Sequence, residues 1–296
     1  MSRLPPWIRL SRLTDQHYAA VSDQVKSHAL HTVCESAKCP NRGECWNRGT
    51  ATLMLLGDVC TRACSFCAIQ PGRPDGLDIN EPRRAARAAA GMKLNYVVLT
   101  SVTRDDLPDG GAEIFAETIR EIRKRLPHAG IEVLTPDFEG VTELVDIVLE
   151  ARPDVFNHNV ETVARLQAVV RPQAAYGRSL AVLKHAAHTT PRAVVKSGIM
   201  LGLGERDDEV WQTLDDMLAA GVELLTLGQY LQPTRNHPPV QRYVSPDTFA
   251  AMEERALAMG FSGVASGPMV RSSYKADELL SQALARRDAA HAVPSS

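Results

Sequence analysis

Short apolar runs alternate with longer amphipathic stretches along most of this chain. The apolar runs have the length of buried strands, and the amphipathic stretches have the length of helices. The expected strands are residues 52–56, 96–100, 131–135, 155–157, 193–200, 224–229 and 263–265. The expected helices are residues 81–92, 111–126, 141–150, 161–169, 179–188, 207–220 and 246–259. This alternation predicts an α/β fold in which right-handed crossovers join the strands of a parallel sheet.

The number of strand–helix units predicts an incomplete barrel. An eight-stranded parallel barrel needs about 250 residues, whereas residues 52–265 hold six full units and one last strand. We therefore expect a partial (β/α)6-type barrel over residues 52–266. Residues 1–51, with one helix at about 16–30, form an N-terminal extension. Residues 267–296 form a short C-terminal extension, and we expect its tail to fray after about Ala285.

The composition argues against two classes of protein. No apolar run approaches the roughly 20 residues of a membrane-spanning helix, and Pro5 and Pro6 interrupt the N-terminus where a secretory signal needs an apolar stretch. The formal net charge of −2 argues against a general nucleic-acid-binding protein. We expect a cytoplasmic protein that binds neither a membrane nor a nucleic acid. In that reducing compartment, cysteines serve as metal ligands or catalytic thiols more often than as disulfides.

All 6 cysteines lie between residues 34 and 67. They form two triplets with different spacing, C-x4-C-x5-C and then C-x3-C-x2-C, which comprise Cys34, Cys39 and Cys45 and then Cys60, Cys64 and Cys67. The first triplet lies in a turn-rich stretch, and the second begins where the expected strand 52–56 ends. Buried structural cysteines would be scattered among strands and helices, so this clustering indicates ligands.

Three thiolates in each triplet favour iron–sulfur clusters over zinc. Structural zinc closes a tetrahedron with four ligands and prefers paired C-x2-C elements. A zinc site that borrows a histidine remains an alternative. A cubane cluster held by three cysteines leaves one iron open for chemistry, so we interpret the triplets as two iron–sulfur sites.

The segment from Cys60 to Cys67 resembles the signature of the radical S-adenosylmethionine superfamily. It reads CTRACSFC, follows the first strand of a βα repeat, and carries the aromatic Phe66 before the last cysteine. The resemblance implies that Cys60, Cys64 and Cys67 hold a [4Fe–4S] cluster whose open iron chelates S-adenosylmethionine. Reductive cleavage of that cofactor would yield a 5′-deoxyadenosyl radical, which removes hydrogen atoms from unactivated carbons.

Further stretches resemble motifs of the lipoyl synthase family. They are TVCESAKCPN with the following CW (residues 32–46), TSVTRDDL (100–107), DVFNHNVET (154–162), GQYLQP (228–233) and GPMVRSSY (267–274). The similarity extends from about residue 25 to residue 276. Ser36 and Lys275 depart from the family pattern, but neither is an expected ligand.

This family resemblance implies a sulfurtransferase with protein substrates. Such an enzyme inserts sulfur at C6 and C8 of an octanoyl chain attached to a lysine, and it consumes two molecules of S-adenosylmethionine for each lipoyl group. The implied carriers are the lipoyl domains of 2-oxoacid dehydrogenase E2 subunits and the glycine-cleavage H protein. An electron donor such as flavodoxin or ferredoxin, and an iron–sulfur carrier that renews the spent cluster, are further implied partners.

The resemblance also implies that Cys34, Cys39 and Cys45 hold a second, auxiliary [4Fe–4S] cluster, which gives up its sulfide. Its fourth ligand in the family is the second serine of the C-terminal motif, which is Ser273 here. An alkoxide is a harder ligand than a thiolate and a poor match for sulfide-bound iron, so its release is chemically reasonable. Without the motif, Ser272 and Ser273 would be an ordinary polar turn or helix cap.

Polar residues after two expected strands are candidates for cofactor binding. Asn157, Asn159 and Glu161 follow the strand 155–157, at the end where barrel enzymes carry functional groups. Helix capping explains Asn159 and Glu161 equally well. Ser101 and Arg104 follow the strand 96–100, where an ordinary exposed loop is the alternative.

A charged residue lies inside another expected strand. Lys196 is surrounded by apolar residues in strand 193–200, and an unpaired buried ammonium would be costly, so we expect a carboxylate partner or a bound ligand. His158 and His237 could be ligands, although hydrogen-bonded structural histidines are more common.

Two other functions remain open at this stage. One is a different radical enzyme that inserts sulfur, such as a methylthiotransferase acting on transfer RNA or a relative of biotin synthase. A transfer-RNA enzyme should add an RNA-binding module and a basic surface, and the sequence has no sign of either. The other is a non-catalytic iron–sulfur carrier or zinc-binding module, which would not need the long βα region.

Overall fold

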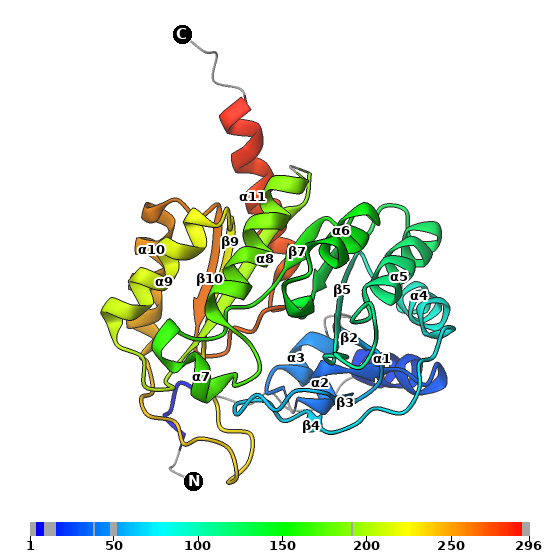
Figure 1. Ribbon diagram of the computed structural model, residues 1–296, viewed down its shortest axis with the longest axis horizontal. Coiled ribbons are helices and arrows are strands. Elements are labelled where there is room, and N and C mark those ends of the chain that lie inside the picture. Colours follow the sequence, from blue (N-terminus) through cyan, green and yellow to red (C-terminus); the bar gives the residue numbers. More distant parts are fainter. Residues whose placement is uncertain (1–3, 9–15, 38, 48–51, 191, 292–296) are drawn as a thin grey trace.

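The computed structural model describes residues 4–8, 16–37, 39–47, 52–190 and 192–291 (Figure 1). Its main sheet has the strand order β1-β2-β5-β6-β7-β8-β9-β10. These strands are β1 (His31–Thr32), β2 (Thr52–Leu55), β5 (Tyr96–Ser101), β6 (Gly130–Leu134), β7 (Val155–Asn157), β8 (Val194–Leu201), β9 (Leu224–Gln229) and β10 (Gly263–Gly267). Neighbouring strands from β2 to β10 are parallel, and β1 is antiparallel to β2. The predicted parallel α/β fold is confirmed.

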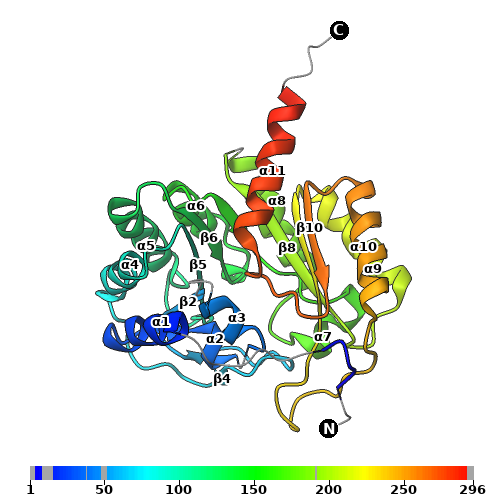
Figure 2. The same ribbon diagram turned by 180° about the vertical axis from the view of Figure 1, so that it is seen from behind.

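Helices between the strands cover the outer face of this sheet (Figures 1 and 2). They are α4 (Glu81–Gly91), α5 (Ala112–Arg125), α6 (Thr142–Glu150), α8 (Tyr176–Thr189), α9 (Asp207–Ala219) and α10 (Pro246–Met259). Small side chains on α4, such as Ala85 and Ala89, are fully buried and allow the close packing of α4 on its neighbour α5. Ser245 caps the N-terminus of α10, because its hydroxyl accepts a hydrogen bond from the backbone N–H of Thr248.

The expected helix at residues 161–169 is wrong. A 3₁₀ turn (η2, Ala164–Leu166) and the single-turn helix α7 (Gln167–Val170) stand in its place. Glu161 has a φ of 71° and forms a bridge with Ile199 of β8. Its backbone N–H donates to the carbonyl of Gly198 at 2.9 Å. The chain therefore continues alongside β8 after β7 ends, because pairing with the sheet satisfies its backbone more fully than an isolated helical turn would.

The N-terminal elements gather at one end of the sheet (Figures 1 and 2). They are α1 (Gln16–Ser27), α2 (Val33–Ser36), α3 (Arg42–Asn47) and a two-stranded ribbon formed by β3 (Val59–Cys60) and β4 (Gln70–Pro71), which the sequence did not predict. Helices α1 and α3 contact each other, and the rings of Tyr18 and Trp46 lie 4.9 Å apart. This aromatic contact anchors α3 to the rest of the fold.

Helix α11 (Ala276–His291) lies at the opposite end of the sheet (Figures 1 and 2). Leu279, Leu280 and Ala283 of α11 pack against residues at the N-terminal ends of β7, β8 and β9, which are Val155, Val194 and Leu224. The sequence predicted fraying after about Ala285, but the helix continues to His291. It is held there because Arg287 forms an ion pair with Glu223 and Arg286 donates to the carbonyl of Phe261.

No helix in the described part of the chain has both the length and the apolar character that crossing a membrane requires.

A buried ion pair crosses the interior of the sheet. The ammonium of Lys196 on β8 donates to both carboxylate oxygens of Glu132 on β6, at 2.9 and 3.0 Å, and both side chains are fully buried. Tyr96 and Asn157 donate to the same carboxylate at 3.0 and 3.1 Å. The expected carboxylate partner of Lys196 is therefore Glu132. Together with Tyr96 and Asn157, this pair connects the four neighbouring strands β5, β6, β7 and β8.

We predict that Lys196→Met destabilises the protein strongly, because it leaves the Glu132 carboxylate buried without a cation. Removal of one partner from a buried pair costs about 3–5 kcal/mol of unfolding free energy. Chemical denaturation of the purified protein measures this loss. The double variant Lys196→Met/Glu132→Gln should recover a large part of it, and a single variant as stable as the wild type would contradict the assignment.

Candidate active site

The C-terminal ends of the parallel strands surround a cavity of about 1160 Å³. Both cysteine triplets reach it, because the residues that line it include Cys34, Cys39, Cys60, Cys64, Cys67 and Ser273. Cys45 lines a smaller cavity of about 270 Å³, which Ser273 also lines. The tertiary structure thus brings five of the six cysteines and the distant Ser273 to one cavity, and Ser273 also lines the second cavity with Cys45.

The second triplet lies on a loop that begins at the end of β3. The sulfur of Cys60 accepts hydrogen bonds from the backbone N–H groups of Thr103 and Arg62, at 3.3 and 3.5 Å. A tight turn joins the other two cysteines of this triplet, since the N–H of Cys67 donates to the carbonyl of Cys64 at 3.1 Å. Burial raises the pKa of the Cys64 thiol and raises that of Cys67 to about 12. Thiols in such a site become thiolates only when a positive group such as iron replaces the proton.

The first triplet is held by α2, α3 and the turn between them. The N–H of Cys39 donates to the carbonyl of Cys34 at 3.2 Å. Burial raises the pKa of the Cys34 thiol, while the Thr52 backbone and the Trp46 side chain act in the opposite direction. The buried indole N–H of Trp46 has no hydrogen-bond partner among the described residues. An unused donor beside a thiol fits a cluster, because the sulfur atoms of a cluster accept hydrogen bonds.

The two serines of the C-terminal motif point to different parts of the site. The Thr52 hydroxyl donates to the Ser273 hydroxyl at 2.9 Å, and the Thr52 backbone acts on Cys34. The Asn159 amide instead donates to the Ser272 hydroxyl at 2.6 Å. Ser273 therefore lies beside the first triplet, whereas Ser272 is turned toward the end of β7.

The C-terminal motif reaches the first triplet because Gly228 gives it room. A Cβ atom at Gly228, near the end of β9, would lie 2.4 Å from the carbonyl oxygen of Val270. Two further contacts hold this segment against the N-terminal elements. The Asn41 amide donates to the carbonyl of Met269 at 2.5 Å, and the Tyr274 hydroxyl donates to the Glu44 carboxylate at 3.0 Å.

Three of the predicted cofactor contacts, Asn159, Glu161 and Ser101, line the large cavity. Burial raises the pKa of Glu161, whose carboxylate accepts a hydrogen bond from the Asn159 amide at 3.1 Å. The Oδ1 of Asn159 and the hydroxyl of Ser101 are buried without a hydrogen-bond partner among the described residues. Unused buried polar atoms in a cavity wall are suited to a polar ligand.

The other three predicted cofactor contacts do not line this cavity. Arg104 forms a bidentate ion pair with Asp106, with both distances 2.8 Å, and donates to the carbonyls of Leu56 and Gly76. Asn157 and Lys196 both bind Glu132. The charges of Arg104 and Lys196 are therefore paired with carboxylates, whereas the Oδ1 of Asn157 is buried without a hydrogen-bond partner among the described residues. The cofactor contacts of these three residues stay predictions.

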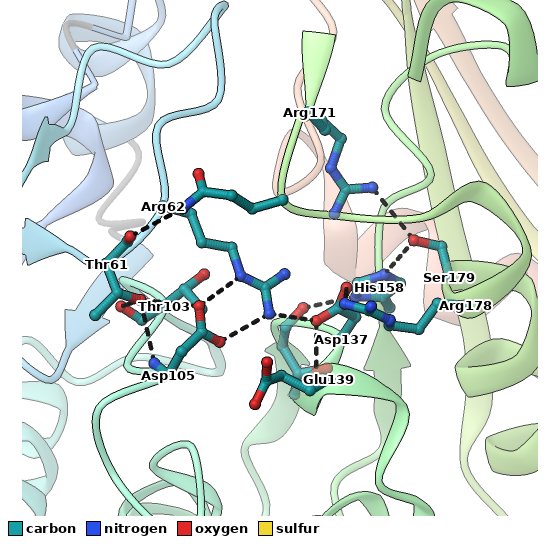
Figure 3. A network of polar contacts seen from close by, with 12 residues as sticks. Thr61, Arg62, Thr103, Asp105, Asp137, Glu139, His158, Arg171, Arg178 and Ser179 are labelled. Atoms are coloured by element: carbon teal, nitrogen blue, oxygen red, sulfur yellow. Dashed lines mark hydrogen bonds and ion pairs between the residues drawn. The ribbon is translucent and has the colours of Figure 1, made fainter. Parts of the chain in front are cut away.

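Two buried arginines at the cavity were missed in the sequence. Arg62 lies inside the second triplet and forms ion pairs with Asp105 and Asp137 (Figure 3). Arg171 follows α7 and donates to the carbonyls of Asn159 and Val160, both at 3.1 Å. The position of Arg62 between two ligands was a usable signal. Arg171 had none, because the segment around it was expected to be an ordinary helix.

The two histidines are both hydrogen-bonded. His158 lies between the carbonyl of Thr135 and the hydroxyl of Ser179, each at 2.9 Å, and burial lowers its pKa to about 4. The His237 Nε2 bonds the carbonyl of Cys67 at 2.9 Å, which ties the loop after β9 to the second triplet. Within the described residues, no group of three or more His, Cys, Asp or Glu side chains is arranged to hold a single metal ion.

The fold and the cysteine loop define a radical S-adenosylmethionine protein. The sequence model of the radical SAM superfamily matches residues 54–217. Solved structures with the same fold include methylornithine synthase, with a TM-score of 0.54, 13% identity and coverage of 97% of this chain and 95% of that chain. SuiB of Streptococcus suis bound to S-adenosylmethionine has a TM-score of 0.57 and 10% identity, and the match covers 76% of this chain and 54% of that one.

Much closer sequence relatives are lipoyl synthases. The protein of Rubrobacter xylanophilus is 53% identical over 93% of this chain and 85% of that relative. Those of Symbiobacterium thermophilum and Thermus thermophilus are 51% and 52% identical over 98% and 95% of this chain, and 91% and 88% of the relatives. The chain belongs to the lipoyl synthase family of the radical SAM superfamily. Membership implies a [4Fe–4S] cluster and S-adenosylmethionine as cofactors, which sets the zinc and carrier alternatives aside.

We predict that the unfolding free energy falls between about pH 6.5 and pH 4, in part because of His158. An unfolded histidine takes up a proton near pH 6.5, whereas the pKa of the buried His158 is about 4. The unfolded state therefore gains protons first as the pH falls, and this shift is equivalent to about 3 kcal/mol. Denaturation of the metal-free protein across this range should have a flatter pH profile in His158→Asn. A pH profile of His158→Asn identical to that of the wild type would contradict the lowered pKa of His158.

Proposed function

We propose that this protein catalyses the insertion of two sulfur atoms, at C6 and C8, into an octanoyl chain attached to a lysine of a carrier protein. The observation that carries this proposal is that the second triplet, two cysteines of the first triplet and Ser273 line one cavity, while Cys45 lines a smaller cavity that Ser273 also lines. A chain that only cleaved S-adenosylmethionine would need the second triplet alone. A reaction that adds sulfur also needs a sulfur source near the radical, and the position of Cys34 and Cys39 at the same cavity supports the first triplet as its holder.

Cys60, Cys64 and Cys67 are proposed to hold a [4Fe–4S] cluster with one open iron. When bound, this cluster and S-adenosylmethionine supply a 5′-deoxyadenosyl radical, which removes hydrogen from carbons that no base can deprotonate. Two C–H bonds are replaced by C–S bonds, so two molecules of S-adenosylmethionine are needed for each lipoyl group. The loop supplies three thiolates and no fourth, which leaves room for the amino acid part of the cofactor.

Arg171 is a suitable partner for the carboxylate of the cofactor. It is buried at the cavity, and among the described residues it forms no ion pair with a carboxylate. Its charge lowers the pKa of the Cys64 thiol, opposing the effect of burial, so it lies within electrostatic reach of a proposed cluster ligand. Asn159, Glu161 and Ser101 are proposed to bind the polar groups of the ribose or methionine. A buried cation with unused capacity is favourable only when an anion occupies the site.

Apolar side chains are proposed to hold the octanoyl chain and exclude water from it. The cavity walls include Met54, Val98, Val102, Ile199 and Leu134. A radical on carbon reacts with many neighbouring groups, so a dry and shaped wall limits side reactions. Burial of the acyl chain also supplies binding free energy in proportion to the apolar surface removed from water.

Cys34, Cys39, Cys45 and Ser273 are proposed to hold the auxiliary [4Fe–4S] cluster as the sulfur donor. Thr52 orients the hydroxyl of Ser273 on the side of Cys34, and Trp46 offers its unused N–H to a sulfur atom. Serine is a harder ligand than cysteine, so it is the ligand most easily released when sulfide leaves. Ser272 is occupied by Asn159 and is a weaker candidate for this role.

The proposed partners follow from this chemistry. The substrates are octanoylated lipoyl domains of 2-oxoacid dehydrogenase E2 subunits and the glycine-cleavage H protein. Their docking is transient, because each carrier must arrive with its acyl arm and leave after modification. An electron donor such as flavodoxin or ferredoxin supplies electrons, and an iron–sulfur carrier replaces the consumed cluster. We place the reaction in the cytoplasm.

We predict that Ser273→Ala and Ser272→Ala have different effects on iron content. Two cubane clusters need about eight irons for each chain. Ser273→Ala should impair the auxiliary cluster and leave the radical-forming cluster intact, whereas the matched control Ser272→Ala should retain both. Iron and sulfide analysis with Mössbauer spectroscopy, after anaerobic reconstitution, measures this. Equal loss from both sites in Ser273→Ala would mean that Ser273 is structural.

We predict that the reduced protein converts an octanoyl-lysine peptide into a dithiolated product in the presence of S-adenosylmethionine. Mass spectrometry should find a peptide heavier by two sulfur atoms, because each of two C–H groups becomes C–SH, and chromatography should find 5′-deoxyadenosine. Cys60→Ala should form neither product, because it lacks the radical-forming cluster. Cys34→Ala should form 5′-deoxyadenosine without thiolated peptide. Formation of 5′-deoxyadenosine by the wild type with no gain of sulfur would rule out this substrate.

A further inference from the structure

Arg62 lies between two proposed cluster ligands in the sequence, yet its guanidinium forms ion pairs with two carboxylates of the protein. Its side chain is only 5% exposed. The Nε and Nη2 atoms donate to the two oxygens of Asp105, both at 2.8 Å, and Nη2 also lies 2.7 Å from Asp137 (Figure 3). A bidentate arginine–carboxylate pair fixes orientation as well as distance, since both groups are planar.

Asp137 joins this arginine to a second strand end. It follows β6, its side chain is completely buried, and it accepts a hydrogen bond from the Glu139 N–H at 3.1 Å. Arg178 of α8 reaches the other carboxylate oxygen at 3.3 Å (Figure 3). Burial acts to raise the pKa of Asp137, but the hydrogen bond and charge of Arg62 outweigh it, and the pKa lies below its ordinary value. Asp137 is therefore an anion held in one place.

Asp105 joins the same arginine to the end of β5. Its backbone N–H donates to the Thr61 hydroxyl at 3.1 Å, and the Thr61 N–H donates to the carbonyl of Thr103 at 3.0 Å (Figure 3). The N–H of Thr103 in turn donates to the Cys60 sulfur. The first ligand of the loop and its arginine are thus attached to one strand end by a continuous set of hydrogen bonds.

The far side of the loop is held by the segment after α7. The Gln173 side chain accepts a hydrogen bond from the Ala63 N–H at 2.7 Å and donates to the carbonyl of Thr61 at 3.3 Å. The Ser65 N–H donates to the carbonyl of Val170 at 2.9 Å. These are neutral hydrogen bonds, which contribute about half as much as charge-assisted ones. The ion pairs of Arg62 are therefore the strongest constraint on the loop.

Arg62 and Arg171 consequently differ in what they offer to a ligand. The guanidinium of Arg62 is paired with two carboxylates, those of Asp105 and Asp137, whereas Arg171 binds backbone carbonyls and forms no ion pair with a carboxylate among the described residues. A buried cation whose charge is already offset by two carboxylates attracts a further anion only weakly. Arg62 is thus suited to hold the loop rather than the cofactor.

We propose that Arg62 is a positioning residue, which fixes the loop from Cys60 to Cys67 against the ends of β5 and β6 so that its three thiols keep one arrangement. This inference rests on the proposed function only in placing a cluster on that loop. It does not depend on which carbon the radical attacks or on the auxiliary cluster. Preorganisation of this kind lowers the cost of assembling the cluster and slows its loss.

The test compares iron release and spectra in the reconstituted protein. Arg62→Gln should release iron from the radical-forming cluster to a chelator on the order of tenfold faster, because it loses charge-assisted hydrogen bonds. It should also alter the electron paramagnetic resonance signal that the reduced cluster shows on addition of S-adenosylmethionine. Asp137→Asn should act in the same direction. The double variant should lose little more than Arg62→Gln alone, since Arg62→Gln already removes the ion pair with Asp137.

A matched control separates positioning from general stability. Arg287 also forms a bidentate pair, with Glu223, at the opposite end of the sheet. Arg287→Gln should lower the unfolding free energy without changing the iron release rate or the cofactor-dependent spectrum. Arg62→Lys, which keeps the charge but not the planar fork, should restore stability more than it restores the spectrum.

Two results would overturn the inference. One is an Arg62→Gln protein with the iron release rate and spectrum of the wild type. The other is an equal acceleration in Arg287→Gln, because the effect would then follow stability alone. A wild-type protein that cleaves S-adenosylmethionine but adds no sulfur to an octanoyl peptide would refute the proposed function. The Arg62 variants could still be compared in that case, because their test measures only the radical-forming cluster.

Discussion

The parallel orientation of the strands is the constraint on which the site depends. Because the strands of the main sheet from β2 to β10 all run in the same direction, their C-terminal ends meet at one rim. The cysteine loop comes directly after this first strand of the repeat, and the loops after later strands close around it. Ser101, Asp137, Asn159 and Gly228 come from four different strand ends, and each has a separate task at this rim.

Buried charge divides the interior into structural and functional parts. Lys196 with Glu132, Arg104 with Asp106, and Arg62 with its two aspartates are all paired within the protein. Since an unpaired buried charge is costly, these pairs hold strands and loops in a fixed relation. Arg171 lies at the same rim but forms no such ion pair among the described residues, so its charge is left for an anion. The distinction explains why only some of the charged residues near the cavity are suited to bind a cofactor.

Contacts with neighbouring elements fix the position of the C-terminal motif (residues 267–274) at the site. Gly228 allows the chain at Val270 to pass directly over the end of β9, and Asn41 and Tyr274 hold it against the N-terminal elements. On this path Ser272 meets Asn159, and Ser273 meets Thr52. The two adjacent serines therefore have different surroundings, because their side chains point in different directions from the backbone.

The sequence by itself determined the parallel α/β class, the helices from α4 to α10 apart from the segment at 161–169, and the two cysteine triplets. These are local properties, because hydrophobic period and ligand spacing can be read along the chain. Only the tertiary structure decided that Lys196 pairs with Glu132, that Arg104 binds Asp106, and that Glu161 leaves the helical region to pair with β8. Each of those depends on a partner distant in sequence or on competition between backbone partners. For the same reason the sequence did not predict the ion pairs of Arg62, because Asp105 and Asp137 are distant from it in the chain.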